Sequence, residues 1–417
     1  MSEAQPAGLL GLRRNLLYAT ASSGSAVLLL GVLVLAGRML GRESYGRFSL
    51  ALALATIGES LMDWGLHQVA IRGVARDSGS APALFRNSVG LKLAPSVAMV
   101  IAITLLARWI RTDGAFPVVC LLLAVSAVMR SYLLTIRGVL QGLEHFGWDS
   151  LVVLLDRILL LALSAAVLLS GGGLTLLAWA FVVARTLALT AALVIAGRHL
   201  GSLAPSFDLA MWSVLRQGAL PLGAFLILLN LYSYVDTVML GVMSSDGETG
   251  LYSAAYRIYE GLTYAPAVLS AVLTPRLSAE FVRDRARHAA LARQGLAATV
   301  GLAAVLAAAT WLAASRLLGY VFGSEFLSAT RALQVLAAGL IVVFPIWILQ
   351  AIAISMTAER VLLRTTAIGV LVNVGANLLL IPAAGRNGAA LATVIGEAVC
   401  LLLLLHGVRD ALWRRAA

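Results

Sequence analysis

The sequence predicts an all-α polytopic membrane protein with about 12 transmembrane helices, arranged in two parallel six-helix bundles around a central cavity. Of its 417 residues, 60% are hydrophobic and only 12% are charged, whereas a soluble domain is about half apolar and about a quarter charged. Apolar stretches of about 20 residues, the length that crosses the hydrocarbon core as a helix, recur along the whole chain. This composition excludes a soluble multidomain enzyme, a disordered protein and a disulfide-rich secreted module.

Twelve apolar stretches meet the length criterion. By residue number they are 15–36, 48–71, 88–106, 117–136, 151–169, 174–196, 220–243, 251–273, 291–314, 332–355, 362–381 and 389–406. The first is longer than the apolar core of a signal peptide, and its small residues precede the apolar part, so we interpret it as an uncleaved helix. The connections are too short to form a separate domain. The function is therefore expected to lie within the membrane.

The basic residues predict the orientation of the helices. If both termini lie on one side, that side receives 20 of the 31 Lys and Arg residues and the other receives 8, while Arg130, Arg185 and Arg257 fall within spans. The 20 include Lys92 and Arg157, which this count places on the cytoplasmic side. Because Lys and Arg are enriched in cytoplasmic loops, the asymmetry predicts cytoplasmic termini. It also accounts for the net charge of +11, so we expect no nucleic-acid partner.

Two segments about 200 residues apart share a pattern that indicates an internal repeat. Each contains Met-Leu-Gly, a short polar stretch, Gly-x-x-Ser and then a glutamate, in residues 38–59 and again in residues 238–260. Because six spans separate the two copies, the halves keep the same orientation. We place the two bundles at residues 1–205 and 206–417. Two packed halves around a central site are the usual plan of an alternating-access transporter.

Arginines inside the predicted spans are the first candidate functional residues. A charge at mid-membrane costs about 2.5–3.5 kcal/mol, so each must face a partner or a wet cavity. Arg130, Arg185 and Arg257 are therefore candidates for binding an anionic substrate. The alternative is that each neutralises a carboxylate and joins two helices, and Glu260 is placed to pair with Arg257 three residues away.

The carboxylates inside the spans form the second candidate set. They are Glu59 and Asp63, which lie one helical turn apart, together with Asp236, Glu260 and Glu397. Such groups could bind a coupling cation or relay protons, or they could pair with the interior arginines. The sequence leaves both interpretations open.

Tyrosines in the second half form a third candidate set. Tyr252, Tyr256 and Tyr259 are spaced four and three residues apart, so their rings share one helix stripe. Tyr252 suits an interfacial belt, whereas Tyr256 and Tyr259 are deeper, where a flat ring with a hydroxyl suits a sugar. The five histidines are scattered, no Gly-x-Ser-x-Gly or P-loop motif occurs, and Cys120 and Cys400 lie in apolar runs. We expect neither an enzyme nor a bound metal or cofactor.

Several of these segments resemble the Wzx-type oligosaccharide flippases, which are polysaccharide biosynthesis proteins of the multidrug/oligosaccharidyl-lipid/polysaccharide (MOP) exporter superfamily. The resemblance is carried by residues 40–51, 63–66 and 70–72 in the first half and by residues 236–241, 250–257 and 273–275 in the second. These motifs are soft patterns of small and apolar residues. In helix number and loop length the resemblance covers the whole chain.

The resemblance implies a MATE-like fold and transfer of an undecaprenyl-pyrophosphate-linked oligosaccharide from the inner to the outer leaflet of the bacterial inner membrane. It implies three kinds of partner: the lipid-linked oligosaccharide, membrane lipids, and a polysaccharide polymerase with other assembly proteins. The interior arginines would then meet the pyrophosphate, which favours this function over a cation-coupled drug extruder of the same superfamily. A membrane polysaccharide polymerase or ligase is a further alternative, but those proteins have a sizeable external loop that this chain lacks.

Overall fold

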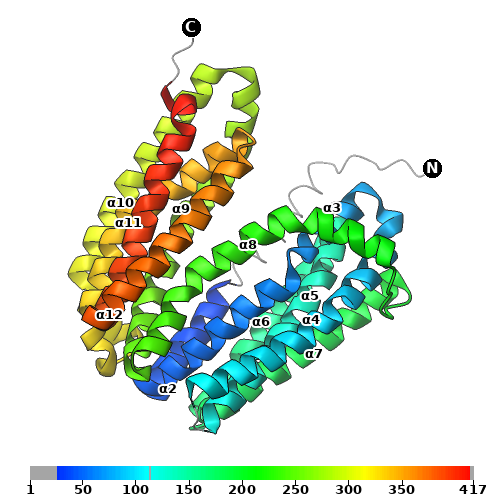
Figure 1. Cartoon of the computed structure of the whole chain (residues 1–417), viewed down its shortest axis with the longest axis horizontal. Coiled ribbons are helices and arrows are strands. Elements are labelled where there is room, and N and C mark those ends of the chain that lie inside the picture. The colour runs from blue at the N-terminus through cyan, green and yellow to red at the C-terminus, as the bar shows by residue number, and fades with distance from the viewer. Residues whose placement is uncertain (1–25, 112–113, 414–417) are drawn as a thin grey trace. The chain divides into compact units, whose positions relative to one another are not determined.

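The computed structural model describes residues 26–111 and 114–413, and every regular element within these ranges is helical (Figure 1). The α-helices are α2 (Ala26–Asp63), α3 (Leu66–Arg76), α4 (Ala81–Ile110), α5 (Ala115–Gly142), α6 (Phe146–Leu169), α7 (Leu174–Leu200), α8 (Leu209–Met243), α9 (Asp246–Arg283), α10 (Arg285–Val321), α11 (Thr330–Ser355) and α12 (Glu359–Trp413), with short 3-10 helices η1 (Ser78–Ser80) and η2 (Ser324–Ala329). In the described residues, eight helices are long and apolar enough to cross a membrane. The predicted all-α polytopic membrane fold is confirmed.

Two long helices are interrupted at glycines. Gly41 in α2 has a φ of 74° and Gly385 in α12 has a φ of 53°, a backbone region that glycine adopts without a steric penalty. Helix α12 therefore contains both predicted spans 362–381 and 389–406. Residues 15–25 of the first predicted span lie outside the described residues.

The predicted span at residues 48–71 was wrong as a single helix. Helix α2 ends at Asp63, and Trp64 and Gly65 follow with φ values of 50° and 75° before α3 begins. The break is fixed by packing, because a Cβ atom on Gly65 would lie 3.1 Å from the backbone nitrogen of Gly223 in α8. Hydropathy alone cannot reveal such a backbone contact.

The chain divides into two compact units. Of the described residues, unit 1 contains those in 26–39 and 54–227, and unit 2 contains those in 40–53 and 228–413. The middle of α2 therefore belongs to unit 2, although the described residues on either side of it belong to unit 1. Helix α8 contributes its first part to unit 1 and its second part to unit 2.

Helix α5 lies at the centre of unit 1. It packs against α3, α4 and α7, while α6 packs against α7, and 61% of its apolar stretch is buried. Small residues on α7, Ala188 and Ala192, lie in the same core as Leu133 and Ile136 of α5. Small side chains let two helices approach closely inside a membrane, which explains the tight α5–α7 packing.

Helix α11 occupies the corresponding place in unit 2. It packs against α9, α10 and α12, and 61% of its apolar stretch is also buried. Helix α5 packs against two helices that precede it, α3 and α4, and against α7 after it, and α11 likewise packs against α9 and α10 before it and α12 after it. A six-helix repeat predicts this correspondence. The predicted bundle limits, residues 1–205 and 206–417, stay a prediction.

Aromatic rings anchor residues 40–53 within unit 2. The ring of Tyr45 lies 6.0 Å, centroid to centroid, from the rings of both Phe322 and Phe326, and these two rings are 5.4 Å apart. Tyr45 and Phe48 are fully buried. Burying a large aromatic side chain is worth about 1.5–3 kcal/mol, so this cluster holds the segment firmly against α10 and η2.

Candidate functional site

The two copies of the repeat meet at Gly46 and Gly250 in unit 2. A Cβ atom on Gly46 would collide with the backbone oxygen of Asp246 and lie 2.9 Å from the backbone nitrogen of Gly250. A Cβ atom on Gly250 would collide with the backbone oxygen of Arg42. The backbones of α2 and α9 therefore touch, and the Arg47–Asp246 ion pair, with an Nε–Oδ2 distance of 2.8 Å, supports this contact.

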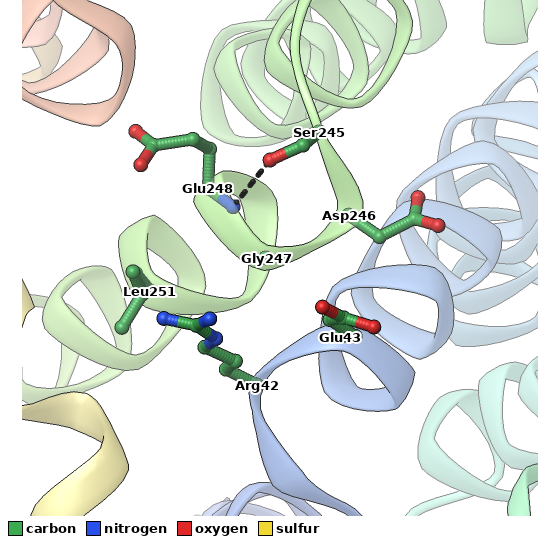
Figure 2. Close-up of a pocket in the computed structure, with 7 residues that line it drawn as sticks. All are labelled: Arg42, Glu43, Ser245, Asp246, Gly247, Glu248 and Leu251. Carbon is green, nitrogen blue, oxygen red and sulfur yellow. Dashed lines mark hydrogen bonds between the residues drawn. The ribbon is translucent and has the colours of Figure 1, made fainter.

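A polar cavity of about 310 Å³ lies beside this crossing (Figure 2). Arg42 and Glu43 of α2 line one wall, and the first turns of α9 from Ser245 to Leu251 line the other. Ser245 caps α9 by accepting a hydrogen bond from the backbone N–H of Glu248 at 3.2 Å. The carboxylate of Glu248 pairs with Arg386 of α12. The residues that line this cavity include none of those predicted to bind substrate.

Unit 1 contains Arg130 and Glu59 as a direct ion pair, with an Nη2–Oε2 distance of 2.5 Å. The Glu59 side chain is 4% exposed, whereas the Arg130 side chain is 29% exposed. The guanidinium is therefore the accessible member of the pair. Arg185 interacts electrostatically with both residues.

Asp63 forms a different pair in the same unit. Its carboxylate pairs with Lys92 of α4, which is fully buried, and also contacts the Nδ1 atom of His67 at 2.7 Å. Lys92 also contacts three further acceptors, Ser131 Oγ at 3.0 Å, Thr135 Oγ1 at 2.7 Å and the Ser131 backbone oxygen at 3.2 Å. A buried ammonium needs this full set of acceptors. Counting Lys92 with the cytoplasmic loop residues was wrong, because it lies inside the predicted span 88–106 and inside α4.

Arg185 of α7 pairs with Asp156 of α6, and both side chains are almost completely buried. The next residue, Arg157, was also wrongly counted on the cytoplasmic side, because it lies inside the predicted span 151–169 and in the middle of α6. Without Lys92 and Arg157, which lie inside predicted spans, 18 of the original 20 basic residues remain on the predicted cytoplasmic side against 8 on the other. The excess of basic residues that predicts cytoplasmic termini therefore remains.

In unit 2, Arg257 and Glu260 of α9 form an ion pair with an Nη1–Oε2 distance of 2.5 Å. The guanidinium also lies 5.9 Å from the ring centre of Tyr256 and 5.7 Å from that of Tyr234, which is within the range of cation–π attraction. Its buried Nε atom has no hydrogen-bond partner among the described residues. Arg257 therefore retains a donor that a ligand could use.

Two buried carboxyl groups in unit 2 have neutral partners. Asp236 accepts hydrogen bonds from Tyr252 at 3.0 Å, from Thr393 at 2.7 Å and from Asn377. Glu397 accepts a hydrogen bond from Tyr259 at 2.5 Å. No ion pair involves either carboxyl group within the described part of the chain.

The predicted site residues thus divide between the two units. Arg130, Arg185, Glu59 and Asp63 lie in unit 1, and Arg257, Tyr256, Tyr259, Asp236 and Glu260 lie in unit 2. Sequence reasoning missed the charged partners in unit 1, which are Lys92, Asp149, Asp156 and Arg157. Residues 26–111 and 114–413 contain no group of three or more His, Cys, Asp or Glu residues that could hold a metal ion.

Comparison with known proteins places this geometry in a family. The sequence model described as polysaccharide biosynthesis protein matches residues 12–281, which is more than half of the chain. A probable low-salt glycan biosynthesis flippase, Agl15, from Haloferax volcanii is 24% identical over 176 residues, which cover 42% of this chain and 37% of that protein. The match therefore spans well under half the length of that relative.

Solved structures share the fold at low sequence identity. An inward-facing multidrug resistance MATE family transporter of the MOP superfamily has a TM-score of 0.77 and 17% identity, with 94% of this chain and 96% of that chain covered. The lipid II flippase MurJ in an inward closed conformation has a TM-score of 0.78 and 14% identity, with 94% and 87% covered. These comparisons confirm the resemblance carried by residues 40–72 and 236–275. The chain belongs to the polysaccharide biosynthesis protein family, and its fold is that of the MOP superfamily transporters.

Proposed function

We propose that this protein is a flippase that transfers an undecaprenyl-pyrophosphate-linked oligosaccharide from the inner to the outer leaflet of the bacterial inner membrane by alternating access. Its termini would lie in the cytoplasm, and a polysaccharide polymerase with other assembly proteins would use its product. Family membership supports the transfer of a lipid-linked glycan. The interior arginines support an anionic substrate.

The observation that carries the proposal is that Arg130 and Arg257 are each held by one carboxylate that a stronger anion can replace. Glu59 and Glu260 contact these guanidiniums at 2.5 Å. A phosphate presents more oxygens and more charge than a carboxylate, and guanidinium binds it through paired hydrogen bonds. In the empty state the glutamates lower the cost of the buried cations, and in the loaded state the pyrophosphate would replace them.

The tyrosines of α9 would support the sugar. Tyr256 stacks on Tyr252 with ring centres 5.7 Å apart and lies 5.8 Å from Tyr259. Tyr256 also borders the guanidinium of Arg257. The pyrophosphate and the first sugar would then bind side by side along this helix.

The test is leaflet transfer of a lipid-linked oligosaccharide in reconstituted vesicles. Replacing Arg130, Arg185 or Arg257 by alanine should reduce transfer about ten- to hundred-fold, because each removes a charge-assisted hydrogen bond. Lysine replacements keep the charge and should reduce transfer less than alanine does. The control is Arg287→Ala, since the Arg287 side chain is 77% exposed in α10. Parent transfer rates in all three well-folded alanine variants would refute the proposal.

A cation-coupled drug extruder is the second candidate, and the environment of Asp236 favours it. Its buried carboxylate is surrounded by hydroxyl and amide groups and by no basic partner among the described residues, which suits a cation. We also propose that Asp236 serves coupling in the flippase, whereas Glu59, Asp63 and Glu260 serve charge pairing. Asp236→Asn should then abolish dependence of transport on the sodium or proton gradient. Drug resistance conferred by the parent chain, without glycan transfer, would favour the extruder.

A further inference from the structure

Arg157 is a buried cation in unit 1, and the ion pairs described above do not explain why it is there. Arg157 lies eleven residues after the start of α6, which places it about 16 Å along a helix that must cross about 30 Å. Its Nε and Nη1 atoms are buried and have no hydrogen-bond partner among the described residues. The nearest carboxylate oxygen, Asp156 Oδ2, is 3.9 Å from Nε, which is beyond hydrogen-bond distance.

The surrounding charges do not balance. Asp156 is already paired with Arg185, so two guanidiniums share one carboxylate. Arg130 and Arg137 also interact electrostatically with Arg157. Each of them has a carboxylate of its own, Glu59 for Arg130 and Asp149 for Arg137. This cluster therefore contains four arginines and three carboxylates, which leaves one positive charge in excess.

A positive charge without a carboxylate of its own is costly within a membrane span unless something uses it. The Arg157 side chain is 17% exposed, whereas the side chains of Asp156 and Arg185 are 2% and 5% exposed. Part of the Arg157 side chain is therefore accessible, whereas the Asp156–Arg185 pair is closed off. The accessible part of the side chain, together with two buried donors that have no partner among the described residues, describes one side of a binding site.

We propose that Arg157, backed by Arg185, is an anion-binding site for a phosphate group. The inference rests on the proposed function, in which the phosphate belongs to the pyrophosphate of the lipid-linked substrate. Phospholipid headgroups carry the same chemistry and are the other possible source. Guanidinium is suited to both because it stays charged and donates several hydrogen bonds to phosphate oxygens.

A structural role and a binding role for Arg157 predict opposite results in the empty protein. If Arg157 only stabilised the fold, Arg157→Met would lower the unfolding temperature. If Arg157 is the excess cation of this cluster, kept for a ligand, the same change removes an unfavourable charge and leaves the temperature equal or higher. The matched control is Arg137→Met. Arg137 donates to Asp149 at 2.6 Å, so its removal should lower the unfolding temperature by leaving a buried carboxylate without its cation.

The experiment measures thermal unfolding of the full chain in neutral detergent, with inorganic pyrophosphate added at constant ionic strength and chloride as the reference anion. Pyrophosphate should raise the unfolding temperature of the parent, and Arg157→Met should bind it about ten-fold more weakly. Arg157→Lys should recover part of the response. A second arm adds phosphatidylglycerol to the micelles.

Each outcome supports or overturns the inference. An Arg157-dependent response to pyrophosphate that persists with phosphatidylglycerol present supports the substrate phosphate as the ligand. A response to phosphatidylglycerol alone supports the site with a lipid headgroup as its source. If Arg157→Met responds like the parent to both probes, or unfolds at a lower temperature than the parent in their absence, the inference is overturned. Because this measurement needs no transport, its failure is distinguishable from failure of the flippase assay.

Discussion

Removing the charge of Asp63 should destabilise unit 1 strongly, because Lys92 would remain as an unpaired buried cation. Asp63→Asn preserves the shape of the side chain but leaves the Lys92 ammonium, which is fully buried, with only hydroxyl and carbonyl acceptors. Breaking a buried ion pair by removing one partner costs about 3–5 kcal/mol. We expect a loss of this size in the free energy of unfolding.

The double variant Asp63→Asn with Lys92→Met supplies the decisive comparison. Removing both charges eliminates the unpaired cation, and Thr135 Oγ1 keeps its hydrogen bond to the Ser131 backbone oxygen at 3.1 Å. The double variant should therefore be more stable than Asp63→Asn by about 2–4 kcal/mol. The assay is denaturant-induced unfolding of purified protein in detergent, with accumulation in membranes measured in parallel.

Two results would refute this reasoning. If the double variant is less stable than Asp63→Asn, the two residues contribute independently and the charges are not coupled. If Asp63→Asn keeps the parent stability but abolishes transport, Asp63 acts in ion coupling instead of charge pairing. Arg287→Ala, at an exposed position of α10, reports the variation expected from an unrelated charge removal.

Three further predictions concern packing, pH and orientation. Gly46→Ala should lower the free energy of unfolding by about 1–3 kcal/mol, because its Cβ would strike a backbone oxygen. Gly301→Ala should not lower it, because a Cβ atom at Gly301 would lie in open space. Thermal unfolding of both variants checks this prediction. Burial and the neighbouring His199 ring lower the pKa of His145 below its usual 6.5. The unfolded chain therefore binds the proton more readily, and the free energy of unfolding should fall as the pH drops below about 6.5. His145→Gln should flatten this dependence of stability on pH, and an unchanged dependence would exclude His145 as its source. Ser245→Cys in a background without other cysteines should react with a membrane-impermeant thiol reagent in intact cells, because Ser245 is exposed at the end predicted to be external; labelling only after lysis would reverse the orientation.

Helix placement was predictable because a membrane span must satisfy a length and an average hydropathy, and both are local properties of the sequence. The Arg257–Glu260 pair was predictable for the same reason, since a spacing of three residues places two side chains on one helix face. The break at Gly65 was not predictable. It depends on the backbone of Gly223, which lies far away in the sequence.

The charge pairs of unit 1 show where sequence reasoning ends. Lys92 and its partner Asp63 are 29 residues apart, as are Arg185 and its partner Asp156. No local periodicity relates such positions, because the pairing depends on which helices become neighbours. Lys92 and Arg157 were miscounted for a different reason, since hydropathy places both inside the predicted spans 88–106 and 151–169.

The placement of residues 40–53 in unit 2 has a consequence for biosynthesis. The glycine and aromatic partners of this segment, Gly250, Phe322 and Phe326, leave the ribosome more than 200 residues after Gly46 and Tyr45. At about 5–20 residues per second, the segment waits roughly 10–50 s before its native contacts exist. A chain limited to residues 206–417 would lack this segment entirely. When residues 1–205 and 206–417 are expressed separately, neither half should complete its native packing. Co-expression of the two halves should restore that packing in both.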